Sequence, residues 1–132
     1  MAWLLDTNIV IAAIKGVPVM RERLREVLAI DLLLSPVVLG ELEYGVEKSE
    51  YPERNREKLR TVIDGFPLLP LDAETSHAYG RIRASLERQG KPTGGNDLGI
   101  AAQALAAGAT LVTDNLQEFQ RVPDPKVENW LR

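Results

Sequence analysis

Short apolar runs alternate along this chain with longer stretches in which apolar residues recur at helical spacing. Apolar runs bounded by turn residues are typical of buried strands, and periodic stretches are typical of helices. Strands joined by helical crossovers have to be parallel or mostly parallel. The alternation therefore predicts an α/β fold in three layers, with a mostly parallel central sheet of four to five strands flanked by helices. The predicted strands are residues 2–5, 32–34, 68–71, 109–113 and 127–130.

Proline and glycine mark the ends of most predicted helices. Proline fits the first position of a helix, and glycine fits the position after its end. Ser35, Asp72 and the pair Asn96–Asp97 are candidate N-caps. Pro70 makes the run at 68–71 an edge strand. The predicted helices are residues 7–15, 36–48, 52–65, 73–88 and 98–107, and one that starts at Pro18 with an apolar stripe of Met20, Leu24, Val27 and Leu28.

The length and composition favour one soluble domain. A chain of 132 residues is long enough for a single core, so we expect residues 1–132 to form one domain. The chain has no cysteine, which excludes disulfides, thiolate metal sites and thiol nucleophiles. The apolar N-terminal run is interrupted by Asp6 and has no basic residues before it, so we expect neither a signal peptide nor a membrane span. A cytoplasmic location is expected.

Basic residues are clustered although the net charge is −3. The clusters are residues 21–25, 54–60 and 81–91. They are either solvated helix faces or, for Arg81, Arg83, Arg88 and Lys91, a track for a single-stranded RNA backbone.

Acidic residues stand where local structure does not require them. Asp6 ends the first apolar run, Glu41 lies within a predicted helix, and Asp97 lies at the mouth of an alanine-rich helix. Asp114 and Asn115 follow the clearest strand. Each acid alone has a simpler explanation, as a helix cap or an exposed residue. In a parallel sheet, however, strand ends and a helix N-terminus can converge on one cleft.

Carboxylates gathered in one cleft require protonation or a cation. Mg²⁺ or Mn²⁺ suits an all-oxygen site with waters completing the shell. The single histidine, His77, lies within a predicted helix without a partner at ligand spacing, so we expect no zinc site there.

Four sequence motifs follow one another along nearly the whole chain. They are residues 4–11, 40–46, 96–104 and a C-terminal set at 111–115, 118–123 and 127–130. In this order they resemble the PIN-domain family, and within it the VapC branch of ribonuclease toxins from VapBC toxin–antitoxin pairs.

The resemblance implies a PIN fold and a Mg²⁺- or Mn²⁺-dependent endoribonuclease. It implies that Asp6 and Asp97 are the principal metal ligands, with Glu41 completing the shell and with Thr7 or Asn8 in support. Where family members often carry a fourth acid, this chain has Asn115, preceded by Asp114, so both remain candidates. The resemblance also implies a homodimer, inhibition by a VapB-like antitoxin, and an RNA substrate such as tRNA or rRNA.

The sequence leaves more than one function open. A metal-activated water could hydrolyse RNA phosphodiester bonds, or the fold could be a catalytically weak module that binds RNA or protein. Aspartyl phosphotransfer is disfavoured because Asn8 stands where such phosphatases need a second aspartate. The apolar faces of the helix around residues 37–46 and of the helix with Met20, Leu24 and Leu28 are expected to pack mostly into the core, or else to form a groove for an antitoxin segment.

Overall fold

A four-stranded parallel sheet forms the centre of the computed structural model, which describes residues 1–91, 94–120, 122 and 125–131. The strand order is β2-β1-β3-β4, and every pair is parallel. This confirms the predicted α/β class and the parallel sheet. The strands are β1 (Trp3–Leu5), β2 (Leu32–Leu33), β3 (Thr110–Val112) and β4 (Val127–Glu128).

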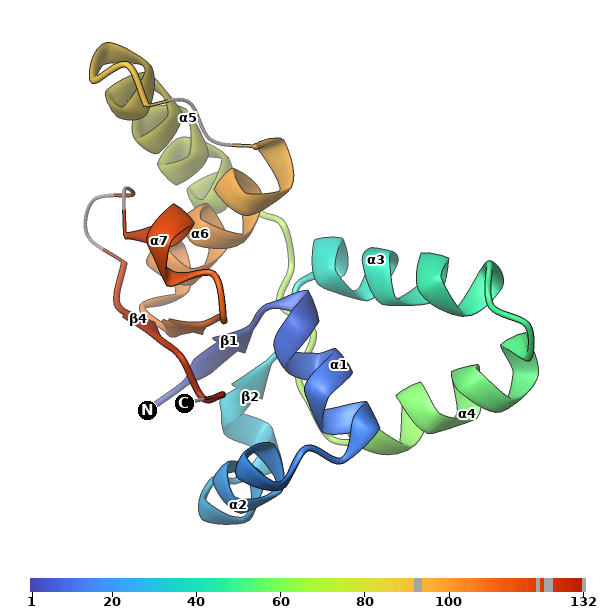
Figure 1. Ribbon diagram of the computed structural model, residues 1–132. Helices are drawn as coiled ribbons and strands as arrows, with labels where there is room; N and C mark the ends of the chain where they lie inside the picture. The colour runs from blue at the N-terminus through green and yellow to red at the C-terminus, as the bar shows by residue number, and fades with distance from the viewer. Residues whose placement is uncertain (92–93, 121, 123–124, 132) are drawn as a thin grey trace.

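The helices flank this sheet, with α5 and α6 on one side and α1, α2 and α4 on the other (Figure 1). The chain moves from β1 to β2 in one direction and from β2 to β3 in the other. The β1–β2 connection carries α1 and α2, and the β2–β3 connection carries α3 to α6, of which α4 lies on the side of α1. The described helices are α1 (Thr7–Lys15), α2 (Pro18–Glu26), α3 (Pro36–Glu47), α4 (Pro52–Ile63), α5 (Ala73–Arg88), α6 (Gly95–Ala107), α7 (Leu116–Phe119) and the short 3₁₀ helix η1 (Ala29–Asp31).

Several helices begin or end at the capping residues predicted from the sequence. Gly16 and Gly108 adopt the left-handed conformation after α1 and α6, which glycine tolerates without strain. The Ser35 hydroxyl accepts a hydrogen bond from the Val37 N–H, and Asp72 accepts one from the Thr75 N–H. These local bonds fix where α3 and α5 begin.

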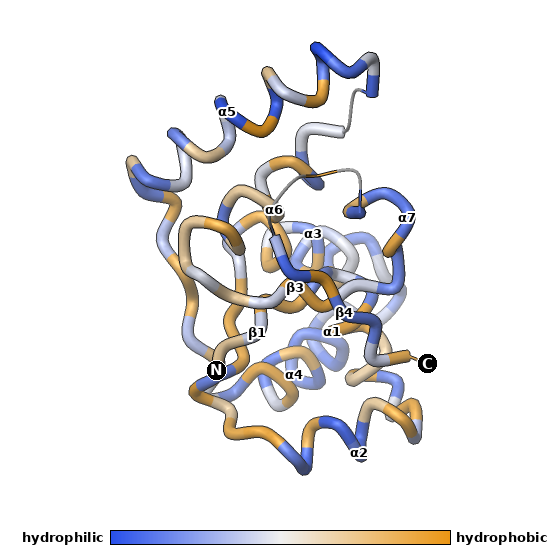
Figure 2. Tube along the Cα trace, turned by 90° about the vertical axis from the view of Figure 1, so that its left-hand side faces the viewer, coloured by the Kyte–Doolittle hydropathy of each residue, from blue (hydrophilic) through white to orange (hydrophobic). Residues whose placement is uncertain are grey.

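The core lies between the sheet and its helices. β1 and β3 are almost entirely buried, and α6 contributes small side chains that let α5 approach it closely. Trp3 and Trp130 meet edge to face at 5.7 Å, and the Arg23 guanidinium lies over the Trp130 ring. Apolar segments therefore gather at the sheet, while α2 and α5 carry mixed polar faces outward (Figure 2).

Three local predictions are wrong. Residues 68–71 form no strand, because only Leu68 makes a bridge, to Leu34, before Pro70. α2 ends at Glu26, so Val27 and Leu28 lie outside it and Leu28 is exposed. α6 begins at Gly95 with Gly94 as its N-cap, so Asn96 and Asp97 lie in its first turn rather than capping it.

Two elements, η1 and α7, were not predicted, and both are too short to show a clear period. In the described ranges no helix is both long and apolar enough to cross a membrane.

Candidate active site

The carboxyl ends of β1 and β3 lie side by side and bring Asp6 next to Thr113. From β1 the chain leaves toward β2, and from β3 it leaves toward β4 on the opposite side. Such a switch point opens a crevice beyond the strand ends. Asp6 is held there on both oxygens: Oδ1 accepts from the Thr7 N–H at 2.8 Å, and Oδ2 accepts from Thr113 Oγ1 at 2.7 Å.

Asp6 is buried, with 9% of its surface exposed. Burial raises the pKa of its carboxyl, because desolvation disfavours the charged form. Its two hydrogen bonds oppose that shift, while the nearby charges of Asp114 and Glu41 add to it. Asp6 is therefore electrostatically coupled to acids from two other parts of the chain.

Glu41 reaches the same place from α3. Its Oε2 accepts a 2.6 Å hydrogen bond from Thr7 Oγ1, and its Oε1 accepts a 2.7 Å bond from Asn96 Nδ2. The half-buried Glu41 carboxylate thereby joins the first residue of α1 to the first turn of α6.

Asp97 lies next to this junction, half-buried in the first turn of α6. Burial raises the pKa of Asp97, and Asp6, Glu118 and Glu41 raise it further by charge repulsion. The N-termini of α1 and α6 both point at the cluster, and their partial positive charge favours anions there.

Asp114 and Asn115 are the two candidates for the fourth residue of the acidic cluster, and they contribute in different ways. Asp114 is exposed after β3, and its Oδ1 accepts a 3.3 Å hydrogen bond from Asn8 Nδ2. Asn115 contributes through its backbone, since its N–H donates to Thr113 Oγ1 at 3.0 Å. Its neighbour Asp114, like Glu41, raises the pKa of Asp6 through its charge.

Sequence reasoning missed three residues of this site. Thr113 and Asn96 hold Asp6 and Glu41 directly, and Glu118 acts on Asp97 through its charge. Asn96 and Glu118 lie inside the quoted motifs, but a motif does not indicate which of its side chains face the cleft. Thr113 is the last residue of the clearest predicted strand, and its position at a strand end is the signal that was available.

The acidic cluster presents oxygen donors to a cation. Among the described residues, ion pairs join Arg56 to Glu43 and Glu47, and Arg83 to Glu87, and none of these involves Asp6, Glu41 or Asp97. Within the described ranges no three acidic or histidine side chains are arranged to ligate one ion together. Mg²⁺ commonly takes one or two carboxylates and completes its octahedron with water. The oxygen-only, repelling cluster fits such an ion.

The basic clusters lie outside this site. Arg83 pairs with Glu87 at 3.1 Å, and Arg56 pairs with Glu43 at 3.6 Å. Arg81, Arg88 and Lys91 are exposed, as a solvated face or an RNA track would require. His77 is exposed on α5.

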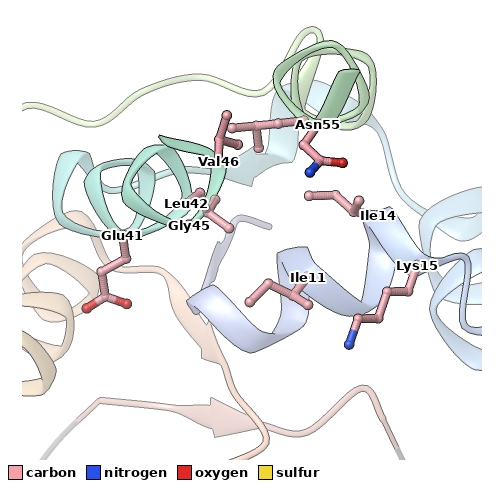
Figure 3. Close-up of a pocket in the computed structure, with 9 residues that line it drawn as sticks. Ile11, Ile14, Lys15, Glu41, Leu42, Gly45, Val46 and Asn55 are labelled. Carbon is pink, nitrogen blue, oxygen red and sulfur yellow. The ribbon is translucent and has the colours of Figure 1, made fainter. Parts of the chain in front are cut away.

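A groove of about 340 Å³ adjoins the acidic cluster between α1, α3 and α4 (Figure 3). Glu41 lies at one end, while Lys15 and Asn55 supply the other polar groups. The apolar wall comes from Ile11, Ile14, Leu42, Val46 and Leu59, with Gly45 between them. α3 lines this groove, whereas Met20, Leu24 and Leu28 do not. The predicted pairing of α3 with the helix that carries Met20 and Leu24 stays a prediction.

Comparison with known proteins gives one consistent result. The family model described as PIN domain matches residues 3–125. Ribonuclease VapC2 of Rickettsia felis is 41% identical over 132 residues, covering 98% of each chain. The tRNA(fMet)-specific endonuclease VapC of Shigella flexneri is 41% identical over 129 residues, covering 97% of each chain.

A solved structure supports the same likeness. In the crystal structure of VapBC2 from Rickettsia felis bound to a DNA fragment from their promoter, one chain matches with a TM-score of 0.91 and 41% identity. The match covers 98% of this chain and 99% of that one. The three-layer arrangement is thus shared along the whole length.

Proposed function

Because the chain belongs to the PIN-domain family and is similar to VapC ribonucleases over nearly its full length, we propose that it is a metal-dependent endoribonuclease, the toxin of a VapBC-type pair. Residues 1–132 form, in this proposal, a single PIN domain. The observation that carries the proposal is the convergence of Asp6, Glu41 and Asp97 from three distant segments into one coupled acidic cluster.

Asp6 and Asp97 are the proposed direct ligands of Mg²⁺ or Mn²⁺. Both lie at helix N-termini, and the pKa of both carboxyls is raised, mainly by burial and further by repulsion from neighbouring acids, which a cation would relieve. Glu41 completes the site, with Asp114 and Asn115 at its edge. Thr7 and Asn8 support it by donating hydrogen bonds to Glu41 and Asp114.

The chain's own residues position the reaction. When bound, the cation supplies a water of lowered pKa and stabilises negative charge on the phosphate. Thr113 and the Thr7 N–H hold the Asp6 carboxylate in one orientation, which removes the reorganisation that a free side chain requires. Asp97 is half-buried whereas Asp6 is buried, so of these two carboxyls Asp97 is the more accessible to solvent.

The substrate is proposed to be RNA, with tRNA the first to test. Two relatives, at 41% and 39% identity, are named tRNA(fMet)-specific endonucleases. Exposed loops of structured RNA offer unstacked bases and an accessible backbone. The exposed Arg81, Arg88 and Lys91 are candidate backbone contacts, because exposed basic side chains attract the phosphate backbone of RNA.

The partner is proposed to be a VapB-like antitoxin, with the toxin acting as a homodimer. Solved relatives from Rickettsia felis and Salmonella typhimurium are VapBC assemblies bound to DNA. The groove beside Glu41 combines an aliphatic wall with a carboxylate at its end, which suits a peptide with apolar side chains and one arginine.

The test is cleavage of tRNA and total RNA by purified, antitoxin-free protein with Mg²⁺, Mn²⁺ or EDTA. We expect discrete products with 5′-phosphate ends that are lost in EDTA and in Asp6→Asn and Asp97→Asn. Asp64→Asn, an exposed acid at the end of α4, is the matched control and retains activity. Binding of RNA without cleavage by the folded wild type would replace the nuclease with the binding module.

A further inference from the structure

Asn96 is the residue of this site whose geometry is hardest to explain as local structure. It is exposed at the second residue of α6, two positions past the N-cap position that asparagine favours. That cap is provided instead by Gly94 without a side-chain bond. The Asn96 amide points across to α3 and donates to Glu41 Oε1 at 2.7 Å.

The bond completes a two-sided hold on one carboxylate. Thr7 Oγ1 donates to Oε2 of Glu41 at 2.6 Å, and Asn96 donates to the other oxygen. A carboxylate offers about four lone-pair sites, so about two remain free after these bonds. Their orientation is then fixed by α1 and α6 together rather than by the rotamer of Glu41 alone.

The neutral amide also separates two acids. Asp97 follows Asn96 directly, and the Glu41 charge raises the pKa of Asp97. A hydrogen bond to an ionised acceptor is stronger than one between neutral groups. The 2.7 Å bond from Asn96 is therefore a strong constraint on where the Glu41 carboxylate oxygens lie.

We propose that Asn96 is a positioning residue, which holds the Glu41 carboxylate at a fixed spacing from Asp97 so that the pair is ready to receive a divalent cation and its waters. The inference deepens the proposed nuclease function and rests on it. Groups that orient the residues of a metal site commonly change metal affinity or activity by about 10- to 100-fold when removed.

The test uses Asn96→Ala and Asn96→Asp in the full chain. Alanine removes the donor, whereas aspartate keeps the shape, lacks the donor and adds a charge beside Glu41. We expect kcat for RNA cleavage to fall about tenfold in Asn96→Ala and further in Asn96→Asp, with KM changed less than about twofold. Gln89→Ala is the control, because it removes an exposed amide whose 3.1 Å bond goes to Ser85, away from the acids.

A second readout does not depend on activity. Mn²⁺ affinity of the RNA-free protein, measured by electron paramagnetic resonance, is expected to weaken about tenfold in Asn96→Ala and more in Asn96→Asp, while the Tm without metal stays within a few degrees of that of Gln89→Ala.

The outcomes separate the inference from the function beneath it. An Asn96→Ala variant with wild-type kcat and Mn²⁺ affinity would overturn the positioning role of Asn96 without contradicting the proposed nuclease function. A wild type that neither binds Mn²⁺ nor cleaves RNA would overturn both. Equal effects of alanine and aspartate on Tm alone would reduce Asn96 to a structural contact.

Discussion

Thr113 Oγ1 donates a 2.7 Å hydrogen bond to Asp6 Oδ2, joining residues that are 107 positions apart in the chain. The bond is buried and closes the junction between β1 and β3 at their carboxyl ends. Thr113 also accepts from the Asn115 N–H, so one hydroxyl ties the start of the β3–α7 loop to Asp6.

Removing that hydroxyl is expected to impair catalysis more than folding. Thr113→Val keeps the shape but leaves Asp6 Oδ2 without its donor, and we expect kcat to fall about 10- to 100-fold. Thr61→Val is the control, since the Thr61 hydroxyl bonds only the backbone of its own helix, at Glu57. Steady-state cleavage of a labelled RNA measures both, and equal rates in the two variants would contradict the role of Thr113.

Metal binding is expected to stabilise the folded protein. At a concentration of Mg²⁺ or Mn²⁺ hundredfold above Kd, the free energy of unfolding should rise by about 2.7 kcal/mol, and EDTA should reverse the change. Asp97→Asn should lose most of this gain, while Asp64→Asn should keep it. Chemical denaturation with and without metal checks the prediction; a gain of equal size in Asp97→Asn would remove Asp97 from the ligand set.

The raised pKa of Asp6 predicts that this residue lowers the stability of the metal-free protein as the pH rises. A carboxyl whose folded pKa lies above its unfolded value of 3.8 favours folding below that value, and the contribution is lost as the pH rises through the folded pKa. Asp6→Asn mimics the protonated form. In EDTA its Tm should therefore match wild type at pH values below the unfolded pKa and exceed wild type near neutrality.

Thermal scans from acid to neutral pH measure this difference, with Asp64→Asn as the reference for an exposed acid. A wild type more stable than Asp6→Asn at neutral pH would show that the hydrogen bonds to Asp6 outweigh its burial.

The Ser35 cap fixes the start of the helix that carries Glu41. The Ser35 hydroxyl is buried and accepts from the Val37 N–H at 3.1 Å. Ser35→Ala should lower the free energy of unfolding by about 1 kcal/mol. Ser76→Ala, on the exposed face of α5, should change it far less. Urea denaturation of both variants measures this difference. Equal losses of unfolding free energy in the two variants would mean that the Ser35 cap does not stabilise the protein.

Gly45 allows the groove to be filled without disturbing the core. A Cβ added at Gly45 or at Gly40 meets nothing within 4 Å, but only Gly45 lines the groove. Gly45→Gln should weaken antitoxin binding at least tenfold, and both variants should gain about 0.5 kcal/mol from better helix propensity. Calorimetric titration with the antitoxin tests this, with Gly40→Gln as the control on the same helix. Unchanged binding by Gly45→Gln would place the antitoxin elsewhere.

Much of the fold follows from local signals in the sequence. The helix at residues 7–15 and the starts of the helices at Pro18, Pro36 and Pro52 agree with the structure. These signals work because proline and glycine restrict or permit particular backbone angles wherever they occur. The prediction of a strand at residues 68–71 was wrong because leucines alone do not make a strand. Pro70 lacks the N–H that a strand would need, and Leu68 and Leu71 are exposed.

The resemblance to the PIN-domain family, carried by the four motifs, is confirmed by the family match. The roles of Asp6, Glu41, Asp97, Asp114 and Asn115 stay predictions. What supports them is that Asp6, Glu41 and Asp97 are brought into one cluster, with Asp114 beside them.

The sequence by itself determined the α/β alternation and the placing of acids at strand and helix ends, because both depend on residue type and short-range spacing. Only the tertiary structure decided which polar groups face those acids. Thr113 reaches Asp6, and Asn96 reaches Glu41 instead of capping α6. These partners depend on strand order and on how α3 packs against α1 and α6. Such long-range geometry results from burying the whole core at once, and no local pattern encodes it.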